Sequence, residues 1–354
     1  LWHHASQARG FGRGLAGGLG ATWALLRHHD RPTVASALGY AVCTALAFLS
    51  NLYYLHTFIA LSVWSGVVLA ERAWRAEGAP AARALGLVRA GALLHALPVA
   101  TFGFVFGVFY LPGLTGTQFT TDHYGIVVQA ASLVLGGPFV GRAAEWLLSA
   151  ALVALCAGAF ALRRDAQRAW LLYLLAIVAA PALVLAVAQP RALFVRFFAA
   201  SEMFLLLLLA IALAALARWR RAGAVLAAAI GGAVVVANGV HVAELVRYGR
   251  GQYDEAFRYM AAETVGAELS VASDHVLGMQ LMARFYGRLR PEEPIVFVAE
   301  PTPAAPPRWF VRVGRPWPAE LQVAGHLYDR DRLFRTSGFG FDWQLYRLVP
   351  MADA

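Results

Sequence analysis

Long apolar stretches, separated by short polar segments rich in arginine, fill most of the chain before residue 246. The clearest stretch is Phe197–Ala217, in which Glu202 is the only charged residue. Because a helix rises about 1.5 Å per residue, this stretch is roughly 31 Å long, close to the thickness of a bilayer core. The pattern therefore predicts a membrane-spanning helix.

Further apolar stretches predict more crossings, including a weak, glycine-rich one at the start of the chain. Eight crossings are expected in total, at residues 10–27, 33–50, 53–70, 86–111, 145–162, 169–188, 197–217 and 222–243. The first of these contains a G-x-G-x-x-G pattern at Gly12, Gly14 and Gly17. No strand precedes that pattern, so a dinucleotide site is not expected. We interpret the spacing of Gly10, Gly14 and Gly18 in the same stretch as a sign of close helix contact.

The segment 112–142 fits neither a crossing nor an ordinary loop. It begins with the polar sequence TGTQFTTDHYG and continues with the apolar sequence IVVQAASLVLGG. About a dozen apolar residues are too few to cross a bilayer. We therefore expect an outer re-entrant or interfacial helix in this segment.

Arginine residues set the predicted orientation of these helices. The positive-inside rule places short loops that are rich in arginine in the cytoplasm. Under this rule the cytoplasmic ends carry Arg27, Arg31, Arg72, Arg75, Arg83, Arg163, Arg164, Arg168, Arg218, Arg220 and Arg221, whereas the outer ends carry Arg9, Arg142, Arg191 and Arg196.

Beyond residue 246 the pattern changes to short strands and amphipathic helices in a polar background. Strands are expected at 269–273, 295–298, 309–313, 333–335 and 343–348, and helices at 253–266 and 275–286. The fold class is thus a polytopic α-helical membrane protein with about eight transmembrane helices and a small C-terminal extracytoplasmic α/β domain. Its domains are expected at 1–246 and 247–354.

Composition agrees with this class and excludes several others. Hydrophobic residues make up 59% of the 354-residue chain and charged residues 14%, which is typical of a membrane protein. All 30 cationic residues are arginine, so no lysine is present for a Walker-type phosphate loop or a Schiff base. The net charge of +9 follows from arginines at helix ends and does not indicate nucleic-acid binding.

Few side chains suggest redox or metal chemistry. Cys43 and Cys156 both lie in apolar stretches and are interpreted as residues of the helix contacts. The pairs His3/His4 and His28/His29 lack further ligands at suitable spacing, so neither a metal site nor a cofactor is predicted.

Arg191, Arg196 and Glu202 form the first candidate site. An arginine side chain presents a planar fork that suits phosphate oxygens, so Arg191 and Arg196 at the outer end of a helix can bind a lipid-linked phosphate. Glu202 lies inside the bilayer, where an ionisable side chain is by default a functional hypothesis. The alternative is that both arginines extend to the interface and Glu202 pairs with one of them.

The outer segment and a neighbouring join supply the second group of candidates. Asp122, His123 and Tyr124, with Arg142 at the far end of the segment, provide an acid, an imidazole and an anion-binding side chain. His56 lies at the join of two apolar stretches. The alternative is that these polar side chains only solvate a turn or satisfy the backbone.

Four stretches carry a resemblance to a known family. They are LSNLYYLHTFIAL, FYLPGLTGTQFTTDHYG, QPRALFVRFF and the terminal GFGFDWQLYRL. In this order the chain resembles the carboxyl-terminal two-thirds of a bacterial membrane glycosyltransferase of the GT-C class, the group that includes protein O-mannosyltransferases and aminoarabinose transferases.

The resemblance implies transfer of a sugar from a polyprenyl-phosphate donor to an acceptor at the outer face of the bacterial inner membrane. The acceptor would be a glycan, a lipid or a protein. Such enzymes use an acidic residue of their first outer loop as the base, and no matching stretch occurs here. Because the chain begins with Leu1, we expect that this loop lies upstream in a longer protein.

Two other functions fit the same pattern. One is a transporter or flippase of a lipid-linked or anionic substrate, although internal repeats of the kind that transporters often carry are not found in the sequence. The other is a non-catalytic membrane scaffold whose C-terminal domain binds a partner. An upstream outer loop with Asp or Glu would favour the transferase.

Overall fold

The computed structural model divides the chain into two compact units, Leu1–Asn238 and Gly239–Ala354. We describe each unit by itself. The structure describes residues 2–50, 54–77, 79–110, 123–138, 141–165, 168–188, 195–248, 251–264, 268–289, 292, 294–313, 316–336 and 342–350. Within these ranges, the side chains of residues 2–11, 109, 110 and 245 are not described.

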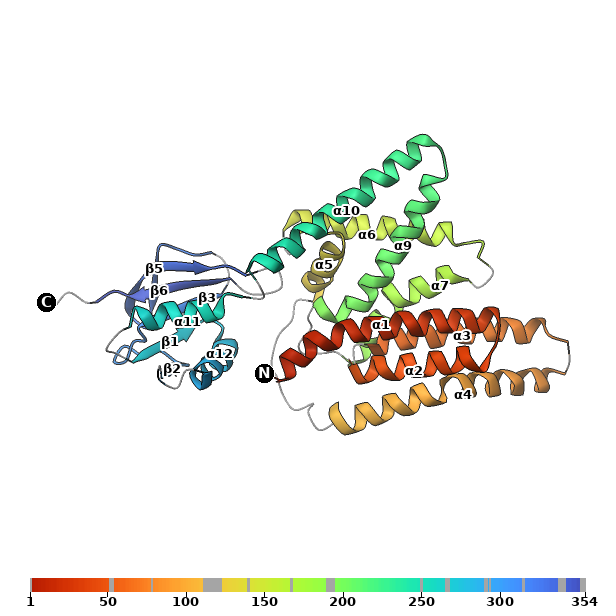
Figure 1. Cartoon of the computed structure of the whole chain (residues 1–354), viewed down its shortest axis with the longest axis horizontal. Helices are drawn as coiled ribbons and strands as arrows, with labels where there is room; N and C mark the ends of the chain where they lie inside the picture. The colour runs from red at the N-terminus through yellow and green to blue at the C-terminus, as the bar shows by residue number, and fades with distance from the viewer. Residues whose placement is uncertain are drawn as a thin grey trace. The chain divides into compact units, whose positions relative to one another are not determined.

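The first unit is helical throughout its regular structure (Figure 1). Its elements are α1 (Trp2–Asp30), α2 (Val34–Ser50), α3 (Leu55–Arg75), α4 (Pro80–Val105), η2 (Phe106–Tyr110), α5 (His123–Val134), α6 (Arg142–Ala161), α7 (Ala169–Leu174), η4 (Leu175–Ala179), α8 (Ala180–Ala188), η5 (Val195–Phe198), α9 (Ala199–Ala217) and α10 (Arg221–Tyr248). The division between the two units falls inside α10.

Five helical stretches are long and apolar enough to cross a membrane. They are Pro80–Val108, Arg142–Ala161, Ala169–Val187, Val195–Ala217 and Arg221–Ala262. Helix α2 and helix α5 are shorter apolar helices, of 17 and 12 residues. A helix suits a bilayer because it satisfies its own backbone hydrogen bonds. The chain is therefore a polytopic helical membrane protein, and the predicted count of eight crossings stays a prediction.

A π-helical turn interrupts the stretch around Pro181. The chain is α-helical in α7, π-helical in η4 and α-helical again in α8, where Pro181 is the second residue. Proline lacks a backbone N–H and crowds the carbonyl four residues earlier, which here belongs to Ile177 in η4. The widened turn thus coincides with the site at which an ordinary α-helical hydrogen bond is impossible.

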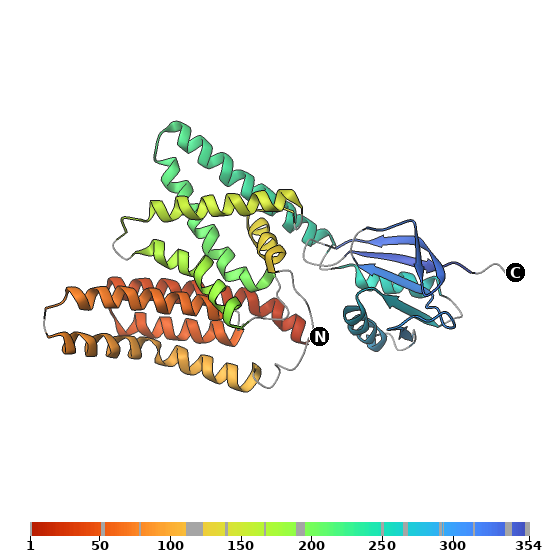
Figure 2. The same ribbon diagram turned by 180° about the vertical axis from the view of Figure 1, so that it is seen from behind.

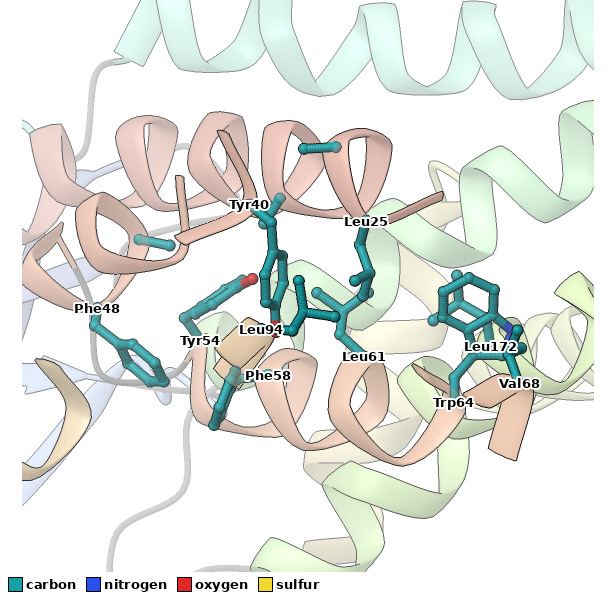
Figure 3. Packing of buried hydrophobic residues seen from close by; sticks show 13 residues of the cluster. Leu25, Tyr40, Phe48, Tyr54, Phe58, Leu61, Trp64, Val68, Leu94 and Leu172 are labelled. Carbon is teal, nitrogen blue, oxygen red and sulfur yellow. The ribbon is translucent and has the colours of Figure 1, made fainter. Parts of the chain in front are cut away.

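The largest core of the helical unit lies among α1, α2, α3 and α4. Figure 3 shows side chains from these helices directed toward one another, with Leu172 of α7 beside them. Trp64, Tyr40 and Leu61 are fully buried there. Such large buried side chains fix the helices against one another through many close contacts.

Glycines allow α1 and α2 to approach closely. A Cβ atom on Gly17 would lie 2.9 Å from the carbonyl oxygen of Cys43, and one on Gly20 would lie 2.9 Å from the Cys43 sulfur. Both distances are too short for a real side chain. The G-x-G-x-x-G pattern lies within α1, and its last glycine, Gly17, is a site of helix contact. Of the three glycines expected at helix contacts, Gly18 lies close to Tyr54, because a Cβ atom there would be 3.1 Å from the Tyr54 ring.

The second unit is a mixed sheet with two helices on one face. Its elements are α11 (Tyr253–Ala262), β1 (Leu269–Ser273), α12 (Val276–Leu289), β2 (Ile295–Phe297), β3 (Trp309–Val313), β4 (Glu320–Val323), β5 (His326–Phe334) and β6 (Trp343–Leu348). The strand order is β2-β1-β3-β6-β5-β4. Strands β2, β1 and β3 are parallel, and the remaining neighbours are antiparallel.

The two faces of this sheet have different cores. On one face, Phe257 of α11 and Met279 of α12 pack with Trp309 and Trp343. On the other face, Tyr328 packs in a second cluster with Phe310 and Tyr346. The hydroxyl groups of Tyr328 and Tyr346 donate hydrogen bonds to the carbonyl oxygens of Pro307 and Pro318, at 2.7 and 2.9 Å.

The strand predictions are largely confirmed, with one correction. The strands at 269–273, 309–313 and 343–348 have the predicted bounds. The short strand expected at 333–335 is the end of the longer strand β5, and its hairpin partner β4 was not predicted.

Candidate functional site

One end of the helical unit collects arginine residues from several helices. The Arg72 guanidinium donates a hydrogen bond to the carbonyl oxygen of His29, near the end of α1. Glu71 accepts from both Arg75 (2.6 Å) and Arg168 (3.0 Å), the residue before α7. These contacts bring the ends of α1 and α3 and the start of α7 together. We call this end of the unit the arginine end.

The opposite end of the unit contains the junction of α3 with η5. The helices run back and forth between the two ends, as Figures 1 and 2 show, so the end of α2 and the start of α3 lie far from the arginine end. His56 and Phe197 are in contact there, with ring centroids 5.4 Å apart. His56 is the second residue of α3, and Phe197 is the third residue of η5.

His56 is the most unusual residue of this junction. Its side chain is 1% exposed, and neither ring nitrogen makes a hydrogen bond within the described part of the chain. A buried polar group without a partner costs about 1–3 kcal/mol. Such a group is expected to have a function that compensates for this cost, for example a hydrogen bond between a ring nitrogen and a bound ligand.

Helix α5 packs against the same junction. Ala130 of α5 lies in one cluster with Phe197 and Phe198, and Ile126 and Val127 pack against that cluster. The predicted candidates His123 and Tyr124 are the first two residues of α5, and both are exposed. The structure thus places the start of α5 at the same end of the unit as His56.

Glu202 lies in the first turn of α9, on the face that packs against α5. Phe198, one turn before it, packs with Ala130, and Leu205 after it packs with Val134. The Oε1 atom of Glu202 is buried and has no hydrogen bond among the residues described. Burial of an ionisable side chain at an apolar helix contact costs free energy, so Glu202 remains a candidate for a functional residue.

The structure describes two of the four remaining candidates. Arg196 lies in η5 and is half-buried, directly before Phe197. Arg142 is exposed at the start of α6. Arg191 and Asp122 lie outside the described residues, so their positions stay predictions.

Two histidines, His29 and His95, lie in the α1–α4 core, and His95 is an addition to the residues considered from the sequence. The hydroxyl of Tyr40 and Nδ1 of His95 are 3.0 Å apart, and Nε2 of His29 is 2.9 Å from the hydroxyl of Ser65. A polar residue within an apolar helix is the signal that marks His95. Unlike His56, these histidines have side-chain partners.

The described residues contain no group of three or more His, Cys, Asp or Glu side chains close enough to hold a metal ion. Comparison of the chain with protein-family models, with curated proteins and with solved structures gives no match.

Proposed function

We propose that the chain is a membrane glycosyltransferase, or the carboxyl-terminal part of one, that uses a polyprenyl-phosphate sugar as donor. The observation that carries this proposal is the buried His56, whose ring nitrogens have no hydrogen-bond partner among the described residues, at the end of the unit that also holds Arg196 and Glu202. The proposal is also supported by the four stretches whose order resembles GT-C glycosyltransferases.

Each residue has a role that follows from its chemistry. Arg196, with Arg191 before it, donates charge-assisted hydrogen bonds to the donor phosphate. A ring nitrogen of His56 donates a hydrogen bond to an oxygen atom of the polyprenyl-phosphate sugar. Glu202 orients a neighbouring group of the same molecule. Since this end lies at the end of apolar helices, a polyprenyl chain reaches the site from the lipid while its phosphate stays at headgroup depth.

The reaction is a substitution at the anomeric carbon of the sugar. The bond from this carbon to the phosphate oxygen breaks, a bond to the acceptor oxygen or nitrogen forms, and the acceptor proton moves to a base. Negative charge develops on the leaving phosphate, where Arg196 and Arg191 stabilise it. The resemblance implies that an acidic residue of an outer loop acts as this base.

The side of the membrane belongs to the same proposal. The arginine end faces the cytoplasm under the positive-inside rule, with eight crossings in total. The His56 end and residues 247–354 then lie outside the bacterial inner membrane. Protease added to intact spheroplasts should cleave residues 247–354, whereas protection until lysis would overturn this orientation.

Transfer of a radiolabelled sugar from polyprenyl phosphate, measured in membranes that contain the full-length protein, tests the activity. Arg191→Ala and Arg196→Ala should each abolish transfer and leave expression intact. Arg31→Ala, a control at the arginine end, should leave transfer unchanged. Unchanged transfer in both outer variants would overturn their assignment, and movement of the labelled lipid across the membrane without sugar transfer would favour a flippase.

A further inference from the structure

An open groove lies between α6 and α9, close to the arginine end of the helical unit. Its volume is about 920 Å³, at the upper end of the range of roughly 300–1,000 Å³ found for ligand pockets. The walls are apolar and include Leu152, Val153 and Leu216. The site proposed for the sugar donor is at the other end of the unit, so this groove is a separate feature.

Small side chains account for the groove. The two helices are in close contact at Gly158, where a Cβ atom would overlap the Leu208 side chain. Ala157 and Ala215 then line the groove beside this contact, and their methyl groups leave the space between the helices unfilled. Both α6 and α9 belong to stretches that are long and apolar enough to cross the membrane, so lipid surrounds this space.

The mouth of the groove is cationic and aromatic. Arg163 and Arg164 line it together with Trp219, which is 75% exposed. The Arg163 guanidinium lies 3.5 Å from the ring centre of Phe160, a cation–π contact that holds it beside the groove. None of the described residues that line the groove is acidic.

We propose that this groove binds an anionic phospholipid, with an acyl chain along the apolar walls and the headgroup phosphate on Arg163 and Arg164. Basic sites between transmembrane helices bind anionic headgroups, and the arginine fork suits phosphate oxygens. Trp219 follows the end of the apolar helix α9 by two residues, and tryptophan is enriched where such helices reach the membrane interface. The charge of the mouth distinguishes this site from ordinary contact of a helix with neutral lipid.

Native mass spectrometry of the full chain, purified in detergent and mixed with phosphatidylglycerol or phosphatidylcholine, tests the charge. Wild-type protein should retain phosphatidylglycerol preferentially. Arg163→Gln/Arg164→Gln should reduce this retention roughly 30-fold, as expected for the loss of two arginines near a phosphate. Arg27→Gln/Arg31→Gln is the matched control, because Arg27 stacks on Trp23 and both arginines are exposed at the same end of the unit.

A second variant tests the shape of the groove without altering charge. Ala157→Phe should fill the groove and reduce retention of phosphatidylglycerol to the level of the arginine variant. Equal retention of the two lipids by wild type, equal losses in both arginine pairs, or full retention by both groove variants would overturn the proposal. Cys156 also lines the groove. If a Cys156–Cys156 cross-link formed between two copies of the chain in membranes and prevented lipid binding, the groove would be a contact between copies and the proposal would be overturned.

Discussion

The imidazole of His56 lies against the ring of Phe197, with ring centroids 5.4 Å apart and an angle of 32° between the planes. This contact joins the start of α3 to the turn that precedes α9, although 140 residues separate them. One level deeper, Ala60 of α3 packs with Phe204 of α9. The two helices therefore hold His56 in a fixed position at the proposed donor site.

His56→Phe separates function from stability at this position. Phenylalanine fills a similar volume and removes two buried nitrogens that lack partners among the described residues, so we expect the melting temperature to stay unchanged or to rise. Sugar transfer should fall by roughly 10-fold to 100-fold, because a donor to the phosphate is lost. Thermal melting and the transfer assay on the full-length protein measure the two effects.

His95→Phe is the matched control for that variant. Nδ1 of His95 forms a hydrogen bond with the hydroxyl of Tyr40. His95→Phe removes this partner of a buried hydroxyl group and should destabilise the protein by about 1–3 kcal/mol. If His56→Phe destabilised the protein as much as His95→Phe does and transfer per folded molecule were unchanged, His56 would have only a structural role.

Glu202→Gln should stabilise the fold and impair transfer. The side chain keeps its shape, while the carboxylate at the apolar contact of α9 with α5 is replaced by a neutral amide, which is cheaper to bury. We expect a higher melting temperature in detergent. Glu145→Gln, at an exposed position in the first turn of α6, should change neither quantity. A lower melting temperature for Glu202→Gln would show that the carboxylate has a stabilising partner in the fold.

Gly158→Ala should weaken the contact of α6 with α9. The added methyl group overlaps Leu208, and forced overlap of this kind costs about 1–3 kcal/mol. Gly66→Ala in α3 is the control, because the space around a Cβ atom there is empty within 4 Å and alanine favours a helix by about 1 kcal/mol over glycine. Thermal melting should move in opposite directions for the two variants, and equal shifts would contradict this account of the contact.

Alkaline pH should loosen the sheet of the C-terminal unit around Tyr328. Burial raises the pKa of Tyr328 to about 12, from an ordinary value of about 10. Between these values the unfolded phenol releases its proton and the folded one keeps it, so the stability present below pH 10 declines as pH rises toward 12.

Limited proteolysis with mass spectrometry, at pH 8 and pH 11, measures this effect as cleavage within β5 and β6. Tyr328→Phe lacks the ionisable phenol and should lose less protection between the two pH values than wild type does. It should also start from lower protection at pH 8, because the hydrogen bond to Pro307 is missing. Tyr124→Phe, at an exposed position in α5, should behave as wild type. An equal loss in wild type and Tyr328→Phe would refute the assignment.

The periodic features of this fold can be predicted from the sequence. The apolar stretch 33–50 becomes α2 (Val34–Ser50), and the short, mainly apolar stretch 309–313 becomes β3. Such signals are local, since they depend on side chains that share one helix or one strand. The short apolar segment after residue 122 likewise forms α5, a helix too short to cross the membrane.

Features that depend on distant contacts or unusual turns could not be predicted. The hairpin of β4 and β5 turns at Ala324 and Gly325, whose φ angles are 50° and 83°. Turns of this kind usually carry Asn-Gly or Asp-Gly, because both positions need a positive φ. Alanine rarely adopts a positive φ, and the Ala-Gly sequence therefore gave no hairpin signal. The burial of His56 is equally invisible in the sequence, because Phe197, which covers it, is far away along the chain.

Photo-crosslinking with a polyprenyl phosphate that carries a reactive group near the phosphate tests the central claim most directly. In membranes with the full-length protein, labelled peptides should include residues 54–60 or 195–204, and Arg196→Ala should remove most of the label. Labelling by the matching polyprenol without phosphate should be weak. Equal labelling by the two probes, or label confined to other helices, would contradict a phosphate site at His56, Arg196 and Glu202.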